Sequence, residues 1–223
     1  MRSRLVRLAL GIVACVITAS VVPAADALPP TELVGGGKVI PLKNAAMITK
    51  TNVGYRYRAG QQDSHLVVTK VGRRLHFKDS GTARLRSLPG SCREQRAAKG
   101  IAASCRVPAK YGVSRPMFVE VWPRLGDDYV NGSTLSAAFR LWALVDAGRD
   151  TVYGGAGADF VNGAHDADKV RGGAGNDWIR TGNGRDTVRG DAGADKIACG
   201  DGADNAWLDR ADRHSKCEAA RRG

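Results

Sequence analysis

The sequence predicts an all-β fold in which short parallel strands stack in successive coils. The first observation is a nine-residue unit that recurs without a gap from Val145 to Trp207. The second is that position six of every unit is Asp, while position eight is aliphatic. The third is the period, which fits neither a 3.6-residue helix nor a heptad and is too short for a helical hairpin. A tight turn followed by a short strand fits each unit.

The invariant carboxylates of the seven units are the candidate metal ligands: Asp150, Asp159, Asp168, Asp177, Asp186, Asp195 and Asp204. The aliphatic positions provide one inward side chain per unit: Val152, Val161, Val170, Ile179, Val188, Ile197 and Ala206. One such side chain cannot form a core alone. Stacked parallel strands can, because they bury a continuous aliphatic ladder and satisfy each other's backbone groups.

Glycines at positions one, two and four give each unit a turn with metal-binding character. They allow positive φ and let several carbonyls face one side of the turn. Carbonyls together with a carboxylate are the hard oxygen ligands that calcium takes six to eight at a time. We expect the best cages in the two units with complete glycine sets, which are Gly154, Gly155 and Gly157 before Asp159, and Gly172, Gly173 and Gly175 before Asp177.

These units resemble the haemolysin-type, or RTX, nonapeptide repeat of the form G-G-x-G-x-D-x-U-x. The resemblance implies a right-handed parallel β-roll that binds Ca²⁺ between stacked turns, with two nonapeptides in each coil. Turns two units apart would then share one edge. Asp150, Asp168, Asp186 and Asp204 would line one edge, and Asp159, Asp177 and Asp195 the other.

Several units depart from this pattern, so we expect unequal sites. Asp166 replaces the turn glycine of the third unit, and Val145, Thr181 and Cys199 replace the first glycine of theirs. Arg149 and Arg185 stand beside a ligand Asp, where a positive charge would repel a divalent ion. The alternative is that both arginines lie on a solvated, screened edge.

The N-terminus has the features of a secretory signal. Arg2, Arg4 and Arg7 precede an apolar run, and a small-x-small pattern ends at Ala27, where we expect cleavage. The run is too short for a transmembrane segment. Lipoprotein anchoring at Cys15 is the less favoured alternative, because the apolar run continues past it.

Removal of the signal leaves four cysteines in an exported chain, which indicates disulfides. Three pairings are possible. The simplest joins Cys92 to Cys105 and Cys199 to Cys217, and the second of these bonds would pin the last coil. Terminal caps of this kind protect the open end of a stack.

The remaining chain divides by composition into a basic β-rich region at 28–120, the repeats at 121–207 (strongest at 145–207) and a C-terminal cap at 208–223. Alternating apolar residues predict strands at 38–40, 46–49, 55–58, 65–71, 74–78, 82–86 and 117–121, with a hairpin turn at Gly72-Arg73. Asp128, in Gly126-Asp127-Asp128-Tyr129-Val130, is a degenerate forerunner of the repeats.

Charge differs between the regions. Residues 28–144 hold 19 Lys and Arg against 7 Asp and Glu, whereas residues 145–207 hold 7 against 11. Candidate partners of the basic region are an anionic cell-wall polymer or surface glycans. We expect no sequence-specific nucleic-acid partner, because no stacking motif is present. The oligomeric state stays open.

The leading interpretation is a secreted, non-catalytic calcium-binding protein with a structural or interactive role at the cell surface. No H-E-x-x-H or G-x-S-x-G motif occurs in the sequence, and the segment before the repeats is short for a catalytic domain. The first alternative is an envelope or anionic-polymer binding module that uses the basic region, with the roll as a spacer. The second is a polysaccharide-acting β-helix enzyme.

Overall fold

The computed structural model describes residues 43–223, and these residues form strands and turns. The expected signal segment and the expected strand at 38–40 lie outside the described residues. No segment within 43–223 is a helix with the length and apolar character needed to cross a membrane. The all-β architecture confirms the predicted fold class.

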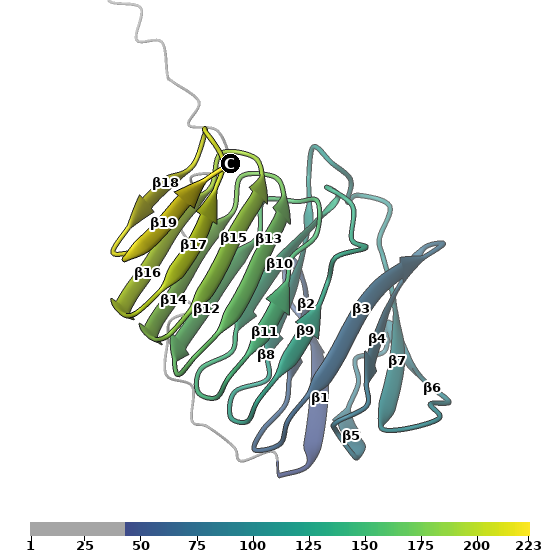
Figure 1. The fold of residues 1–223 in the computed structure, drawn as a ribbon. Helices are drawn as coiled ribbons and strands as arrows, with labels where there is room; N and C mark the ends of the chain where they lie inside the picture. The colour runs from purple at the N-terminus through teal and green to yellow at the C-terminus, as the bar shows by residue number, and fades with distance from the viewer. Residues whose placement is uncertain (1–42) are drawn as a thin grey trace, which may run out of the picture. The chain divides into compact units, whose positions relative to one another are not determined.

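Two sheets contain all the strands, and the chain passes from one to the other in each coil (Figure 1). The first sheet has the order β18-β16-β14-β12-β10-β8-β2-β1-β5. Its strands, in chain order, are β1 (Ala45–Lys50), β2 (Gly54–Arg58), β5 (Arg84–Ser87), β8 (Met117–Trp122), β10 (Phe139–Leu144), β12 (Phe160–His165), β14 (Trp178–Gly184), β16 (Lys196–Gly202) and β18 (Arg213–Ser215).

The second sheet has the order β19-β17-β15-β13-β11-β9-β3-β4-β7-β6. Its strands are β3 (His65–Val71), β4 (Arg74–Asp79), β6 (Cys92–Gln95), β7 (Ile101–Arg106), β9 (Tyr129–Asn131), β11 (Thr151–Tyr153), β13 (Lys169–Ala174), β15 (Thr187–Ala192), β17 (Asn205–Leu208) and β19 (Ala219–Arg222).

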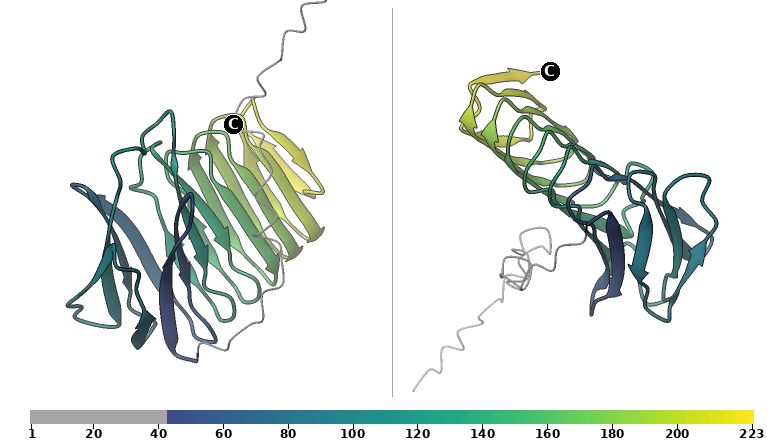
Figure 2. Two further views of the ribbon diagram at one scale, coloured as in Figure 1. Left: turned by 180° about the vertical axis from the view of Figure 1, so that it is seen from behind. Right: turned by 90° about the horizontal axis from the view of Figure 1, so that it is seen from below.

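Each repeat strand pairs in parallel with the strand one coil away, so equivalent positions of alternate units lie side by side. Val152 pairs with Val170, which pairs with Val188. On the other sheet Val161 pairs with Ile179, which pairs with Ile197 in turn. All seven aliphatic positions are buried. The two ladders belong to one buried cluster, which forms the core of the roll. Figure 2 shows the stacked coils from behind and from below.

The turns use the left-handed region at positions two and four. Position four of the last unit is Gly202, with φ of 151°, and a Cβ there would lie 1.5 Å from the carbonyl oxygen of Gly184 in the preceding coil. Only glycine permits that approach between stacked turns. At position two, by contrast, Asp146 and Asp191 adopt φ near 67° and 68°. Short Asp side chains tolerate this conformation.

The N-terminal strands extend both sheets beyond the repeats. β3 and β4 form the predicted antiparallel hairpin, with Gly72 at φ 54° in its turn. β2 then pairs in parallel with β8, and β3 with β9. Large side chains fill this part of the core, including Tyr55, Tyr57 and Phe77. The early strands therefore stack directly on the first coil.

Two disulfides lie toward opposite ends of the stack of strands. Cys92–Cys105 joins β6 to β7, and Cys199–Cys217 joins β16 to the segment between β18 and β19. β18 pairs with β16 and β19 with β17, both in parallel. The C-terminal residues thus add one further coil, although they contain no recognisable nonapeptide.

Candidate metal centre

The seven repeat aspartates form two rows at the starts of strands. Asp150, Asp168, Asp186 and Asp204 immediately precede β11, β13, β15 and β17 of the second sheet. Asp159, Asp177 and Asp195 immediately precede β12, β14 and β16 of the first sheet. The structure therefore places them in the two groups that the repeat resemblance implies. All seven are at most 4% exposed.

In five of the repeat aspartates, one carboxylate oxygen links two successive coils. The Oδ1 atom accepts a hydrogen bond from the backbone N–H of the aspartate one coil earlier. The donor and acceptor pairs are Asp150 and Asp168 (3.0 Å), Asp159 and Asp177 (2.8 Å), Asp168 and Asp186 (2.9 Å), Asp177 and Asp195 (2.8 Å), and Asp186 and Asp204 (2.9 Å). This contact requires a hydrogen-bond acceptor at position six, and it explains what one of the two carboxylate oxygens does.

The other carboxylate oxygen is buried without a protein partner in six of the seven repeats. Those orphan Oδ2 atoms belong to Asp150, Asp168, Asp177, Asp186, Asp195 and Asp204, and Asp128 has one too. A buried anionic oxygen that lacks a hydrogen bond is costly unless a cation or a proton neutralises it. The two rows therefore present oxygens that fit a cation.

Carbonyl oxygens lie beside these orphan carboxylate oxygens. A Cβ built on Gly163 would lie 2.0 Å from Asp168 Oδ2 and 2.6 Å from the carbonyl oxygen of Thr181. A Cβ on Gly172 would lie 2.3 Å from Asp177 Oδ2 and 2.7 Å from the Gly190 carbonyl oxygen. The lack of a side chain at position one thus lets a carboxylate oxygen and a carbonyl oxygen both approach the same backbone. This mixed oxygen set fits the hard ligands that calcium takes.

Burial raises the pKa of these carboxylic acids. The pKa reaches about 9 for Asp150 and Asp177, where neighbouring carboxylates add to the effect of burial. For Asp168 the pKa is raised to about 7, and for Asp195 to about 6, with desolvation again the largest cause. A bound divalent cation would reverse this preference for the protonated form, because it stabilises the carboxylate. Protons and cations therefore compete for these rows.

The turn from Gly154 to Asp159 differs from the others, although its complete glycine set marks it as one of the two best cages. The start of β10 packs on it, so a Cβ on Gly157 would lie 1.8 Å from the carbonyl oxygen of Phe139. Gly155 donates its N–H to Asp159 Oδ2 (2.6 Å), and Leu141 donates to Asp159 Oδ1 (2.7 Å). Both carboxylate oxygens of Asp159 thus accept hydrogen bonds from the protein. The turn before Asp177 differs also in its backbone, because Gly173 and Gly175 have positive φ.

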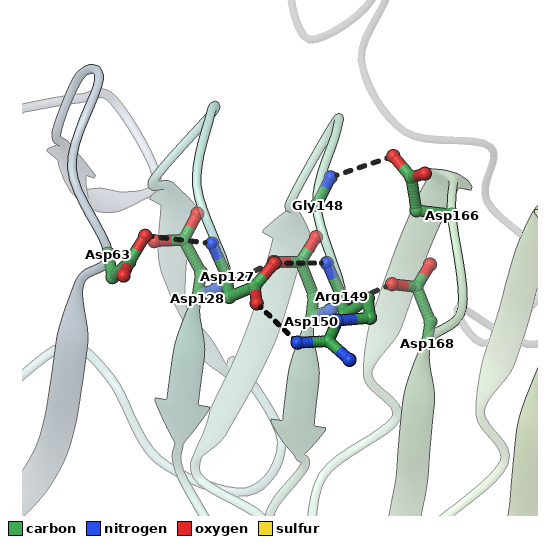
Figure 3. Close-up of polar contacts among 8 residues, drawn as sticks. All are labelled: Asp63, Asp127, Asp128, Gly148, Arg149, Asp150, Asp166 and Asp168. Atoms are coloured by element: carbon green, nitrogen blue, oxygen red, sulfur yellow. Dashed lines mark hydrogen bonds and ion pairs between the residues drawn. The ribbon is translucent and has the colours of Figure 1, made fainter.

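The Arg149 side chain forms an ion pair with Asp127. Its guanidinium contacts Asp127 Oδ2 at 3.1 Å, and its N–H donates to Asp127 Oδ1 at 2.9 Å (Figure 3). These bonds hold the pKa of Asp127 below its usual range. The Arg149 side chain is 73% exposed, which agrees with the solvated-edge alternative. Arg185 is also exposed.

Both rows continue beyond the nonapeptides. Before the repeats, Asp128 accepts from the N–H of Ser64 (2.7 Å) and donates its own N–H to Asp150 (2.8 Å), which extends the role expected of a forerunner. After them, Asp195 donates to Asp212 (3.0 Å) and Asp204 to Glu218 (3.1 Å). The sequence analysis missed Asp212 and Glu218. The available signal was a carboxylate close to one coil length after the last member of each row.

Asp79 is a second residue that the sequence analysis missed. It is 1% exposed and accepts from the hydroxyl of Tyr57, the hydroxyl of Thr82 (2.7 Å) and the N–H of His65 (2.8 Å). It anchors the start of β3 much as the repeat aspartates anchor later strands. Its local sequence, Asp79-Ser80-Gly81, is typical of a turn and gives no sign of this role.

Within residues 43–223, no three His, Cys, Asp or Glu side chains converge on one point. In comparisons with known proteins, residues 144–170 and 171–206 match the family model of the RTX calcium-binding nonapeptide repeat, in four copies. No curated protein and no solved structure matches the chain.

Proposed function

We propose that this chain, whose residues 144–170 and 171–206 match the RTX calcium-binding nonapeptide repeat, binds Ca²⁺ between successive coils and completes its folding on binding, after export. The observation that carries the proposal is the set of buried Oδ2 atoms without partners, one in nearly every repeat. For Asp168 and Asp177, a carbonyl oxygen of the next coil approaches the same position-one glycine as the carboxylate.

The residues that would hold the ion are the orphan aspartates and the neighbouring turn carbonyls, with Asp168 and Asp177 in the clearest positions. Calcium accepts irregular shells of oxygen ligands, whereas magnesium demands near-ideal octahedral geometry and retains its water. Flexible glycine turns with backbone carbonyls therefore favour calcium. The ion would supply the positive charge that these carboxylates lack.

Folding and binding should be coupled. The repeats hold 11 Asp against 7 Lys and Arg and bury one aliphatic side chain per unit, so repulsion opposes folding without a cation. Metal binding energy then contributes directly to folding. Extracellular multi-carbonyl sites typically bind calcium with dissociation constants on the order of 10⁻⁴ to 10⁻³ M, which suits the external medium. Two disulfides are consistent with an oxidising compartment.

Isothermal titration calorimetry of the oxidised, chelator-stripped chain tests the binding step. We expect saturable Ca²⁺ binding at more than one site, in the submillimolar to millimolar range, and little heat from equal Mg²⁺. Replacing Asp168 and Asp177 together by Asn should remove part of the heat. A chain that takes up no calcium, or that takes up magnesium equally well, would contradict the assignment.

A second candidate function uses the basic region to bind an anionic cell-wall polymer, with the roll as a spacer. Its support is a group of exposed cations over β3 to β6: Lys70, Arg73, Lys78, Arg84, Arg86 and Arg93. Reversal of Arg84 and Arg86 to Glu in the full chain should weaken retention on an anionic wall polymer. Unchanged retention would remove this candidate.

A further inference from the structure

An open groove of about 590 Å³ lies on the outer face of the second sheet, near the carboxyl ends of β9, β11 and β13. Figure 1 shows these three strands side by side. The lining of the groove combines two tyrosines, several hydrogen-bonding side chains and the glycine-rich turns: Tyr129, Asn131, Ser133, Tyr153, Gly154, Gly155, Ala156, Arg171, Gly173, Ala174 and Asp191. None of these side chains belongs to the carboxylate rows. We propose that this groove binds a neutral oligosaccharide.

Aromatic rings provide the apolar part of the groove. Tyr129 and Tyr153 occupy adjacent strands, with ring centroids 5.8 Å apart, and His65 stacks on Tyr129 at 4.2 Å. Both tyrosines are partly exposed. The face of an aromatic ring carries partial negative charge and attracts the C–H face of a pyranose ring. Adjacent strands also repeat at about 4.8 Å, a spacing comparable with one sugar unit of an extended chain.

Polar side chains beside the rings are held in fixed orientations. Asn131 donates from Nδ2 to the Tyr129 hydroxyl (3.0 Å), and its Oδ1 accepts from Ser133 Oγ (2.7 Å). Arg171 and Asp191 form two parallel bonds of 2.9 and 3.0 Å. Asn131 Oδ1, Ser133 Oγ and the Asp191 carboxylate retain lone pairs that can accept from sugar hydroxyls, and the Arg171 guanidinium retains N–H donors, at little entropic cost.

The charge of the groove favours a neutral ligand over a polyanion. Its lining contains one Arg and one Asp, which neutralise each other. Arg189 also approaches Asp191, at 3.6 Å, so the same carboxylate offsets part of the Arg189 charge as well. A few placed polar groups around an apolar surface are typical of sites for small organic ligands.

The groove shares a wall with the candidate calcium turns, so this inference rests in part on the proposed function. Gly155 lines the groove and also donates to Asp159, while its carbonyl accepts from Ala174 N–H (2.9 Å). Gly173 belongs to the turn that leads to Asp177. If calcium orders these turns, sugar affinity depends on calcium.

Calorimetry of the full oxidised chain with cellohexaose, laminarihexaose and chitohexaose tests the site. At saturating calcium we expect at least one hexasaccharide to bind, and Tyr153→Ala or Tyr129→Ala to weaken that binding by at least about fivefold. Trp207→Ala is the matched control. Trp207 pairs with Arg189, which pairs with Arg171 of the groove, so Trp207 occupies an equivalent strand position but does not line the groove. It should leave the affinity unchanged.

The outcomes separate this inference from the proposed function. If none of the three sugars binds at millimolar concentration, or if both tyrosine variants bind as well as the control, the glycan site is wrong. Tighter binding of a hexauronate or of a six-nucleotide single strand would overturn the assignment of a neutral ligand. Equal sugar binding in calcium and in chelator would leave the site standing and overturn its dependence on calcium.

Discussion

The two oxygens of a repeat aspartate have different surroundings, so removing one charge should affect metal binding more than stacking. In Asp177, Oδ1 holds the preceding coil while Oδ2 lacks a protein partner. Asp177→Asn keeps an acceptor for the stacking bond and loses the anionic oxygen. We expect the calcium midpoint of the circular dichroism signal to rise several-fold.

Asp159→Asn is the matched control for that change, because both oxygens of Asp159 accept backbone N–H bonds. Its calcium midpoint should move less than that of Asp177→Asn. The comparison also tests the sequence-based ranking, which placed the two turns together on their glycine content. A larger effect at Asp159 would show that the orphan oxygens do not identify the ligands.

The inward ladder makes a separate prediction at the residue scale. Ile179 is fully buried between Val161 and Ile197, so Ile179→Asp would place an uncompensated carboxylate in the core. We expect a loss of about 4 kcal/mol or more in the free energy of unfolding in calcium, measured with urea.

Arg180→Asp on the same strand should cost less than about 1 kcal/mol, because Arg180 is exposed. Trp178, on the same strand, would be a poorer control. It faces away from the core, yet it is half-buried and packs edge-on against Phe160 at 5.2 Å. Equal losses at 179 and 180 would mean that the strand phase is wrong.

At the scale of elements, the terminal disulfide should stabilise one end of the stack. Cys199–Cys217 closes an interval of 18 residues around the last coil. Replacing both cysteines by Ser should cost about 3 kcal/mol locally. Because each coil contacts mainly its neighbours, we expect faster amide exchange in β16 to β19 and little change in β1 to β7.

Replacing Cys92 and Cys105 by Ser is the control at the opposite end, where exchange should quicken in β6 and β7 instead. Hydrogen exchange followed by mass spectrometry distinguishes the two patterns. A uniform change along the chain in both variants would show that the coils unfold as one cooperative unit and that neither disulfide acts as a local cap.

The repeat strands could be predicted because the residues of each unit suffice to place its strand: Asp directly precedes the strand and an aliphatic residue lies inside it. β3 and β4 could be predicted from alternation around Gly72. The strand β10 was not expected, because Phe139–Leu144 lies outside the nonapeptide spacing. Asp212 and Glu218 were missed for the same reason, since their positions depend on the coils beneath them.

The altered turn at Gly154 also depends on tertiary contact. Its sequence matches the repeat form. The difference comes from Leu135, before β10, and Phe139, the first residue of β10, whose carbonyl oxygens lie against Gly155 and Gly157 respectively. A local sequence pattern can rank the turns by their glycine content, but it does not predict which other segment packs on a turn. The site is therefore less uniform than its repeats.

At the scale of the whole molecule, the buried aspartates predict an unusual dependence of stability on pH. Their folded-state pKa values are raised, to between about 6 and about 9 where the shift is large. The metal-free folded chain therefore binds more protons than the unfolded chain above pH 4. This contribution to stability is fully present below the ordinary Asp pKa and is lost as pH rises through the folded values.

In chelator, we expect the thermal midpoint to fall between pH 5 and pH 9. Saturating calcium should remove most of that fall, because the ion replaces the protons, and the apparent calcium affinity should drop at pH 5. A chelator-treated chain that is more stable at pH 9 than at pH 5 would show that these carboxylates are not held in the buried, raised-pKa state.

The central claim is that calcium completes the fold, and far-UV circular dichroism of the oxidised chain 28–223 during calcium titration tests it most directly. We expect little β signal from the repeats in chelator and a cooperative gain across the submillimolar to millimolar range, with no such gain from equal magnesium. A chain that shows its complete β signal in chelator at neutral pH, with both disulfides intact and no response to calcium, would contradict the claim.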